Sequence, residues 1–166
     1  MQKRTRFLAY AALMAALYTA LTYLQDFLIP GSSSWAIQFR ASEALCVLAF
    51  FTPAAIPGLT LGCFLFNMSY AAALPFDWLL GSLATALATG TMYLFRKRKW
   101  LLVPGLLMPA LFNGLFVGWE LSVFVGGTWL MQGVYVALGE AAVLLTLGSI
   151  LVGVFRTRGL DKRLFG

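Results

Sequence analysis

Long apolar runs separated by short polar breaks constrain the fold of this chain more than any other feature of its sequence. Hydrophobic residues make up 61% of the chain without counting glycine, whereas soluble domains have about 45–50% with glycine included. Helices of about 20 apolar residues match the hydrocarbon thickness of a membrane. The chain is therefore predicted to be an all-α integral membrane protein, with six transmembrane helices in a single domain over residues 1–166. The predicted helices cover residues 7–29, 39–52, 54–74, 78–95, 100–117 or as far as 124, and 128–155.

Basic residues gather in three short clusters, at residues 3–6, 96–99 and 156–163. These clusters hold eleven of the twelve lysines and arginines, and Arg40 is the exception. With six helices all three clusters lie on one side of the membrane, which the positive-inside rule identifies as the cytoplasm. With five helices the second and third clusters would lie on opposite sides. Both termini are therefore predicted to be cytoplasmic, and residues 30–39 to form an external loop.

The chain lacks the residues that several kinds of chemistry require. The chain has no histidine, which excludes histidine-based catalytic triads and the HExxH zinc motif. It also has no GxxxxGK[ST] phosphate loop. Cys46 and Cys63 lie in apolar runs without a partner motif, so we expect packing residues rather than a disulfide or a metal site. We therefore expect no catalytic residue, no metal and no cofactor, and the clustered charges do not indicate nucleic-acid binding.

The acidic residues are distributed in the opposite way to the basic ones. Five of the six fall in the predicted outer loops or within the membrane, where Arg40 is the one basic residue. Intramembrane ionisable residues are costly and usually functional. This excess of carboxylates is the most informative functional feature of the sequence. The five acids are Asp26, Glu43, Asp77, Glu120 and Glu140.

Polar residues on three predicted helices occur at depths that would let them meet. At 1.5 Å per residue, two asparagines lie in the outer half of the membrane and Glu140 lies near its midplane. Residues spaced by three, four or seven positions share a helical stripe. Such stripes, interleaved with aromatic residues, predict a pocket that faces outward. Its predicted members here are Asn67, Asn113, Glu120, Trp129, Gln132 and Glu140.

Other roles for the same residues remain open at this point. An asparagine inside a membrane helix also commonly serves helix packing. Arg40 and Glu43 are three residues apart, so the two could pair and cap a helix, and Asp77 could be a helix N-cap. Glu140 costs about 2.5–3.5 kcal/mol at the midplane. It is therefore protonated, paired with Arg40 or paired with a ligand.

Small residues form a wide stripe along the first predicted helix. Small-xxx-small patterns let a second helix approach closely. That second helix could belong to a partner protein or to the same bundle. The stripe contains Ala12, Ala16 and Ala20 at a spacing of four, with Ala11, Ala15 and Thr19 beside them.

Several short motifs resemble those of a known family. Residues 37–45 (IQFRASEAL) and 51–58 (FTPAAIPG) are similar to segments of the QueT family of queuosine-precursor transporters. Residues 81–85 (GSLAT), 112–113 and 139–140 resemble the same family, and the likeness extends over roughly residues 8 to 150. A six-helix protein of this size with an alanine-rich first helix also looks like the substrate-binding S component of an energy-coupling-factor (ECF) transporter.

The resemblance implies a non-enzymatic membrane protein that captures its substrate outside and works with a T component and two ATPase subunits. In S components the alanine stripe meets the T component, which here implies Ala12 and Ala16. The implied substrate is a 7-deazaguanine, whose adjacent N–H groups one carboxylate can accept in a fork. Alternatives are an S component for another vitamin-like molecule, an intramembrane enzyme or a structural membrane protein. The predicted substrate site comprises Glu43 and Glu140 as carboxylates, Asn67, Asn113 and Gln132 as amides, and Arg40, Glu120 and Trp129.

Overall fold

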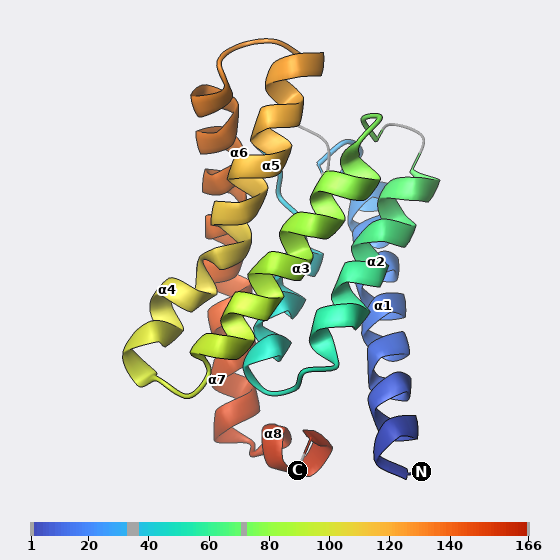
Figure 1. Cartoon of the computed structure of the whole chain (residues 1–166), viewed down its shortest axis with the longest axis vertical. Helices are drawn as coiled ribbons and strands as arrows, with labels where there is room; N and C mark the ends of the chain where they lie inside the picture. Colours follow the sequence, from blue (N-terminus) through green and yellow to red (C-terminus); the bar gives the residue numbers. More distant parts are fainter. Residues whose placement is uncertain (1, 33–36, 71–72, 166) are drawn as a thin grey trace.

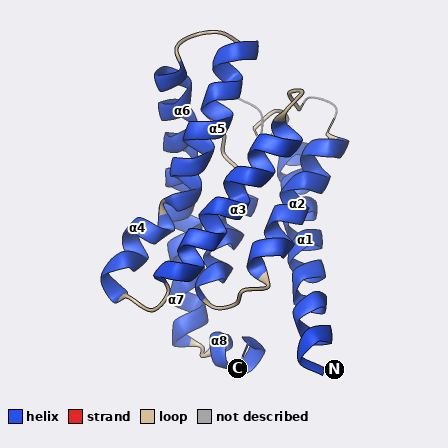
Figure 2. Ribbon diagram, in the orientation of Figure 1, coloured by secondary structure: helices blue, strands red, loops and turns tan. Residues whose placement is uncertain are grey.

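A computed structural model describes residues 2–32, 37–70 and 73–165, and these form a bundle of helices without a described strand (Figures 1 and 2). The longer helices run roughly along the long axis of the molecule (Figure 1). The elements are α1 (Gln2–Leu28), the 3-10 helix η1 (Ala41–Phe50), α2 (Ala55–Ser69), α3 (Asp77–Phe95), the 3-10 turn η2 (Lys99–Leu101), α4 (Leu102–Leu106), α5 (Met108–Phe124), α6 (Trp129–Val143), the π-helical segment η3 (Leu144–Gly148), α7 (Ser149–Thr157) and α8 (Leu160–Phe165).

Both ends of the described chain lie at the same end of the bundle, which we call the terminal end (Figure 1). The turn after α3, which carries the second basic cluster, is also at this end. The loop between α5 and α6 lies at the opposite, far end. The arrangement matches the chain path expected for an even number of membrane crossings.

Among the described residues, four helical stretches are long and apolar enough to cross a membrane: Lys3–Leu28, Asp77–Phe95, Leu102–Phe124 and Trp129–Thr157. The two remaining predicted helices correspond to the shorter apolar helices Ala41–Phe50 and Ala55–Ser69. The all-helical, membrane-spanning character that the sequence predicts is confirmed. The count of six crossings and the cytoplasmic position of the termini stay predictions.

The second predicted helix differs most from expectation. It begins at Ala41 rather than near residue 39, and it is a 3-10 helix of ten residues, whereas most 3-10 runs are three to four residues long. The preceding backbone is extended at Arg40, and Gln38 passes directly over Gly139 of α6, where a Cβ atom would lie 2.3 Å from the Gln38 carbonyl oxygen. Gln25 of α1 holds the same segment, accepting from the Ala41 amide at 2.6 Å and donating to the Phe39 carbonyl.

Two further boundaries were predicted wrongly. The helix α2 ends at Ser69 instead of residue 74, because Tyr70 turns to an extended conformation and residues 73–77 fold into a turn. The predicted helix over 100–124 is divided at Leu107 into α4 and α5. Pro109 explains that break, since proline lacks an N–H and clashes with the carbonyl group four residues before it.

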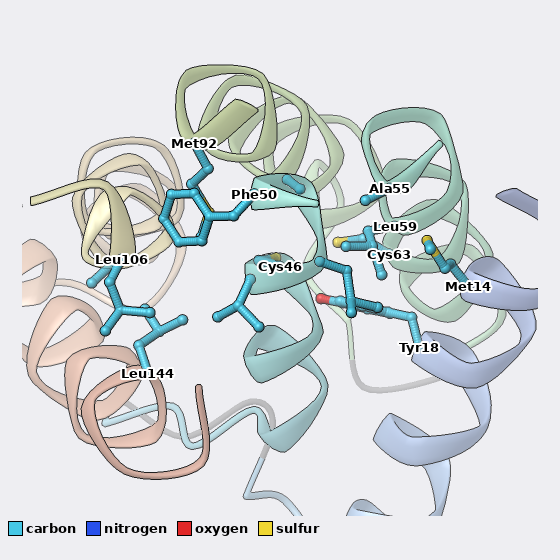
Figure 3. Close-up of a cluster of buried hydrophobic side chains, with 14 residues drawn as sticks. Met14, Tyr18, Cys46, Phe50, Ala55, Leu59, Cys63, Met92, Leu106 and Leu144 are labelled. Carbon is cyan, nitrogen blue, oxygen red and sulfur yellow. The ribbon is translucent and has the colours of Figure 1, made fainter. Parts of the chain in front are cut away.

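The short helix η1 occupies the centre of the bundle. Eight of its ten residues are buried. Figure 3 shows Cys46 and Phe50 of this helix between Met14 of α1 on one side and Leu144 of η3 on the other. Cys63 belongs to the same apolar core, and neither cysteine forms a disulfide. Both cysteines therefore lie in the packed core, as the sequence predicts, and Cys46 also hydrogen-bonds to Glu43.

The small residues of α1 divide between two faces. A Cβ atom at Gly58 of α2 would lie 2.6 Å from the Ala11 carbonyl oxygen, and one at Gly62 would lie 2.8 Å from that of Ala15. Close packing within the bundle thus uses Ala11 and Ala15. Ala12, Ala16 and Ala20 are exposed on a neighbouring face of α1.

Candidate functional site

Buried polar side chains gather between η1, α2, α3, α5 and α6. Seven of the eight residues predicted for the site are buried, and Trp129 is the exception. Each of the buried residues makes at least one hydrogen bond to the surrounding protein. The buried members are Arg40, Glu43, Asn67, Asn113, Glu120, Gln132 and Glu140.

Glu140 of α6 is paired with Asn113 of α5. The Asn113 amide Nδ2 donates to Glu140 Oε1 over 2.8 Å. The other oxygen, Oε2, is buried and has no hydrogen-bond partner among the described residues. Glu140 is 1% exposed, so this second oxygen is shielded from bulk solvent.

Both oxygens of Glu43 are occupied by neighbouring side chains. The Tyr18 hydroxyl of α1 donates to Oε1, and the Cys46 thiol donates to Oε2 at 3.2 Å. Figure 3 shows Tyr18 reaching from α1 toward η1. Beside this contact, Thr22 of α1 donates to Ser42 at 2.7 Å. Glu43 therefore connects η1 to α1, whereas one oxygen of Glu140 has no partner among the described residues.

Arg40 hydrogen-bonds to a second group of residues, which belongs to α2 and α3. Its Nη2 donates to Asn67 Oδ1 at 3.0 Å, and its guanidinium group lies 5.6 Å from the centre of the Phe66 ring. Asn67 Nδ2 in turn donates to the Asp77 carbonyl oxygen at 3.0 Å. The sequence left open that Arg40 and Glu43 pair and cap this helix; Arg40 does occupy the N-cap position of η1, without a side-chain cap bond.

Asp77 is also not the helix N-cap that the sequence suggests. Phe76 occupies the N-cap position of α3. Asp77 is the first residue of the helix, and its Oδ2 accepts from the backbone amide of Leu74 at 2.8 Å. The carboxylate therefore closes the turn that precedes α3.

A third group lies nearer the far end. Glu120 Oε1 accepts from the Phe76 amide at 2.9 Å, and Gln132 Nε2 donates to the Gly126 carbonyl oxygen at 2.7 Å. Glu120 Oε2 and Gln132 Oε1 are buried without a partner among the described residues. At 1.5 Å per residue, these two side chains lie about 10–12 Å from the Asn113–Glu140 pair along their helices.

Trp129 stands apart from these groups. It is 52% exposed, and its indole N–H donates to the Leu115 carbonyl oxygen at 2.9 Å. It lines an apolar hollow of about 300 Å³ between α5 and α6, together with residues such as Leu111 and Val134. The helical stripe that placed Trp129 with Glu140 therefore does not bring the indole to the buried carboxylate.

Three residues that position the site were missed in the sequence. Tyr18 binds Glu43, Gln25 holds the segment before η1, and Gly139 lets that segment approach α6 closely. The spacing in the sequence could have indicated Tyr18, because it lies four residues after Met14 and both residues are on the buried face of α1. Within residues 2–32, 37–70 and 73–165, no group of three or more histidine, cysteine or acidic residues could hold a metal ion.

Comparisons with known proteins give a consistent result. A family model described as QueT transporter matches residues 8–157. The Queuosine precursor transporter QueT of Lactococcus lactis subsp. cremoris (strain MG1363) is 32% identical over 168 aligned residues, which cover 92% of this chain and 90% of that protein. No solved structure matches significantly. The matched region coincides with the part of the sequence that resembles the family.

Proposed function

The chain belongs to the QueT transporter family and is a multi-pass protein of the cell membrane, and from this premise we propose that it is the substrate-binding S component of an ECF importer. Its proposed substrate is a queuosine precursor, a 7-deazaguanine such as preQ1, preQ0 or queuine. The relative from Lactococcus lactis is likewise named as a transporter of a queuosine precursor. The alternative is an S component for another vitamin-like small molecule.

One observation carries the proposal about the substrate. The three buried side-chain atoms without a partner in the described chain are all oxygens: Glu120 Oε2, Gln132 Oε1 and Glu140 Oε2. An unsatisfied buried polar group costs about 1–3 kcal/mol. A ligand that supplies N–H donors removes this cost when it binds. A 7-deazaguanine is such a ligand, because adjacent N–H groups lie along one edge of the base.

Glu140 is the residue that we assign to the base itself. Asn113 holds one carboxylate oxygen, so the group cannot rotate freely and its second oxygen has a defined direction. A carboxylate at this position favours the precursors that carry a cationic aminomethyl group, because charge-assisted hydrogen bonds are the stronger ones. Glu120 and Gln132, about 10–12 Å farther along the helices, are placed to contact the substrate during its approach from the far end.

Arg40 and Asn67 have a supporting role in this proposal. Their hydrogen bond connects the segment before η1 to α2, and Asn67 extends the connection to α3. The two side chains thereby fix the helices that enclose the buried carboxylates. We place Trp129 at the membrane-facing surface, where interfacial tryptophans are common.

The proposed orientation puts the terminal end in the cytoplasm. All three basic clusters belong to segments at that end of the chain path, and the positive-inside rule assigns such segments to the cytoplasm. The far end, with the acidic and amide side chains beneath it, then faces outward, where substrate is captured. Residues 33–36 of the predicted external loop lie outside the described residues.

The proposed partners are a T component and two ATPase subunits. Ala12 and Ala16 support this proposal because they are exposed while the neighbouring alanines of α1 already serve internal packing. A face of small side chains allows close approach of another helix. Substrate release then depends on ATP hydrolysis by the partners rather than on chemistry in this chain.

The direct test is ligand-dependent thermal stabilisation of the purified protein. We would measure the unfolding temperature with preQ0, preQ1, queuine, guanine and a panel of unrelated vitamins. Saturable stabilisation by the deazaguanines supports the proposal. Stabilisation by an unrelated vitamin alone would favour the alternative substrate class, and no saturable ligand at all would favour a structural membrane protein.

A further inference from the structure

A second hollow, at the terminal end, is remote from the buried carboxylates. Its volume is about 360 Å³. Three separate parts of the chain form its walls: the start of α1, the turn between η1 and α2, and the end of α8. Its lining residues are Lys3, Arg6, Phe7, Tyr10, Thr52, Pro53 and Phe165.

The wall that α8 contributes is held by specific contacts with α1. The Tyr10 hydroxyl donates to the Leu164 carbonyl oxygen at 2.6 Å, and Arg6 Nη2 donates to the same oxygen at 3.2 Å. The Phe165 ring packs edge-on against Tyr10, with ring centres 5.3 Å apart, and stacks on Phe155 of α7. The hollow is thus a built feature of the fold, formed where the last helix docks on the first.

The lining combines positive charge with an apolar base. Lys3 and Arg6 are three residues apart on α1 and share one face of that helix. The described lining contains no acidic residue, and Asp161 of α8 is not part of it. Phe7, Tyr10 and Phe165 supply the apolar portion. This combination suits a ligand that has an anionic head and an apolar body.

The position of the hollow identifies the source of that ligand. Lys3 begins the stretch of α1 that is apolar enough to cross a membrane, so the hollow lies at the level where the helix leaves the hydrocarbon. Basic pockets between helices at this level bind phosphate-bearing lipid headgroups. A phospholipid there can place its phosphate beside Lys3 and Arg6 while its glycerol and acyl groups contact the aromatic side chains.

We propose that this hollow binds the phosphate-bearing headgroup of an anionic phospholipid in the leaflet at the terminal end. This function is additional to substrate capture and does not depend on the identity of the substrate. Only the choice of leaflet depends on the proposed orientation. Because the lipid would contact both α1 and α8, it would stabilise the docked position of α8.

The test compares phosphatidylglycerol with phosphatidylcholine of identical acyl chains, titrated into the purified full-length protein and followed by native mass spectrometry. We expect the wild type to retain phosphatidylglycerol preferentially. Lys3→Gln keeps both hydrogen bonds to Leu164 and should lower the preference roughly five-fold, and Lys3→Gln/Arg6→Gln should lower it roughly 25-fold. Phe165→Ala removes no charge but opens the wall, so it should also reduce the preference.

The matched control is Lys97→Gln/Arg98→Gln, which removes the same charge at the same end of the bundle but outside the hollow. An equal loss of preference in both double variants would overturn the proposal, because it would show diffuse attraction to the whole basic surface. Absence of any preference in the wild type would also overturn it. Competition by soluble glycerol phosphate as effective as by the lipid would assign the hollow to a soluble anion instead. None of these outcomes bears on deazaguanine binding.

Discussion

The side-chain amide of Asn113 donates to one oxygen of Glu140 over 2.8 Å and leaves the other oxygen buried without a described partner. This relationship joins α5 to α6 and sets the direction of the carboxylate. It also distinguishes Glu140 from Glu43, whose two oxygens accept from Tyr18 and Cys46. Mutations that affect the two buried glutamates are therefore expected to have different effects.

Tyr18→Phe should destabilise the fold. The variant removes the hydroxyl that donates to Glu43 and leaves a buried acceptor unpaired, which costs about 1–3 kcal/mol. The measurement is the thermal unfolding temperature of the purified protein. Tyr23→Phe is the matched control, since the Tyr23 hydroxyl donates to Ser69 in an exposed setting and its loss should have little effect. Equal unfolding temperatures for the two variants would show that Glu43 does not need Tyr18.

Gly139→Ala should disturb the segment before η1. A Cβ atom at this position would lie 2.3 Å from the Gln38 carbonyl oxygen, and overpacking of this kind typically costs about 1–3 kcal/mol. Unfolding temperature and deazaguanine affinity should both fall, because Gly139 directly precedes Glu140 and a shift of α6 there would displace the carboxylate. Gly153→Ala, which has no heavy atom within 4 Å of the added Cβ, should leave both unchanged. A Gly139→Ala protein with normal stability would contradict the close approach of Gln38.

Ala16→Leu should abolish substrate uptake by the complete transporter while the isolated protein still binds substrate. Ala16 is exposed on the face that we assign to the T component, and a bulky side chain there prevents close helix approach. Ala15→Leu is the informative comparison, because Ala15 is 3% exposed and faces Gly62. That variant should lose stability as well as uptake. If Ala16→Leu also lost stability and binding, its face would belong to internal packing.

The turn at residues 96–99 should be accessible from the cytoplasm. Arg98 is exposed, and both native cysteines are buried, so Arg98→Cys introduces a single reactive thiol. A membrane-impermeant thiol reagent should label it only after the cells are opened. Labelling of intact cells would reverse the proposed orientation and would place the carboxylates beneath the inner surface.

The sequence predicted the positions of the helices well because apolar length and turn residues determine them directly. It also predicted that Asn113 and Glu140 lie at compatible depths. It did not predict the 3-10 form of η1 or the close approach of Gln38 to Gly139, which is a contact between distant parts of the chain. The sequence also could not show which way the Trp129 side chain points, because in a membrane protein an apolar residue can face either lipid or the interior.

The most direct test of the central claim is the affinity of Glu140→Gln for a deazaguanine, measured by calorimetry with preQ1. Because Asn113 donates to this side chain, a glutamine must turn its oxygen toward Asn113 and its NH₂ group toward the ligand, where two donors then oppose each other. The fold should tolerate the change, since an intramembrane charge is removed. We predict a loss of about 2–3 kcal/mol, which corresponds to roughly 30- to 150-fold weaker binding. Wild-type affinity in Glu140→Gln would contradict the account and would place this carboxylate outside the substrate site.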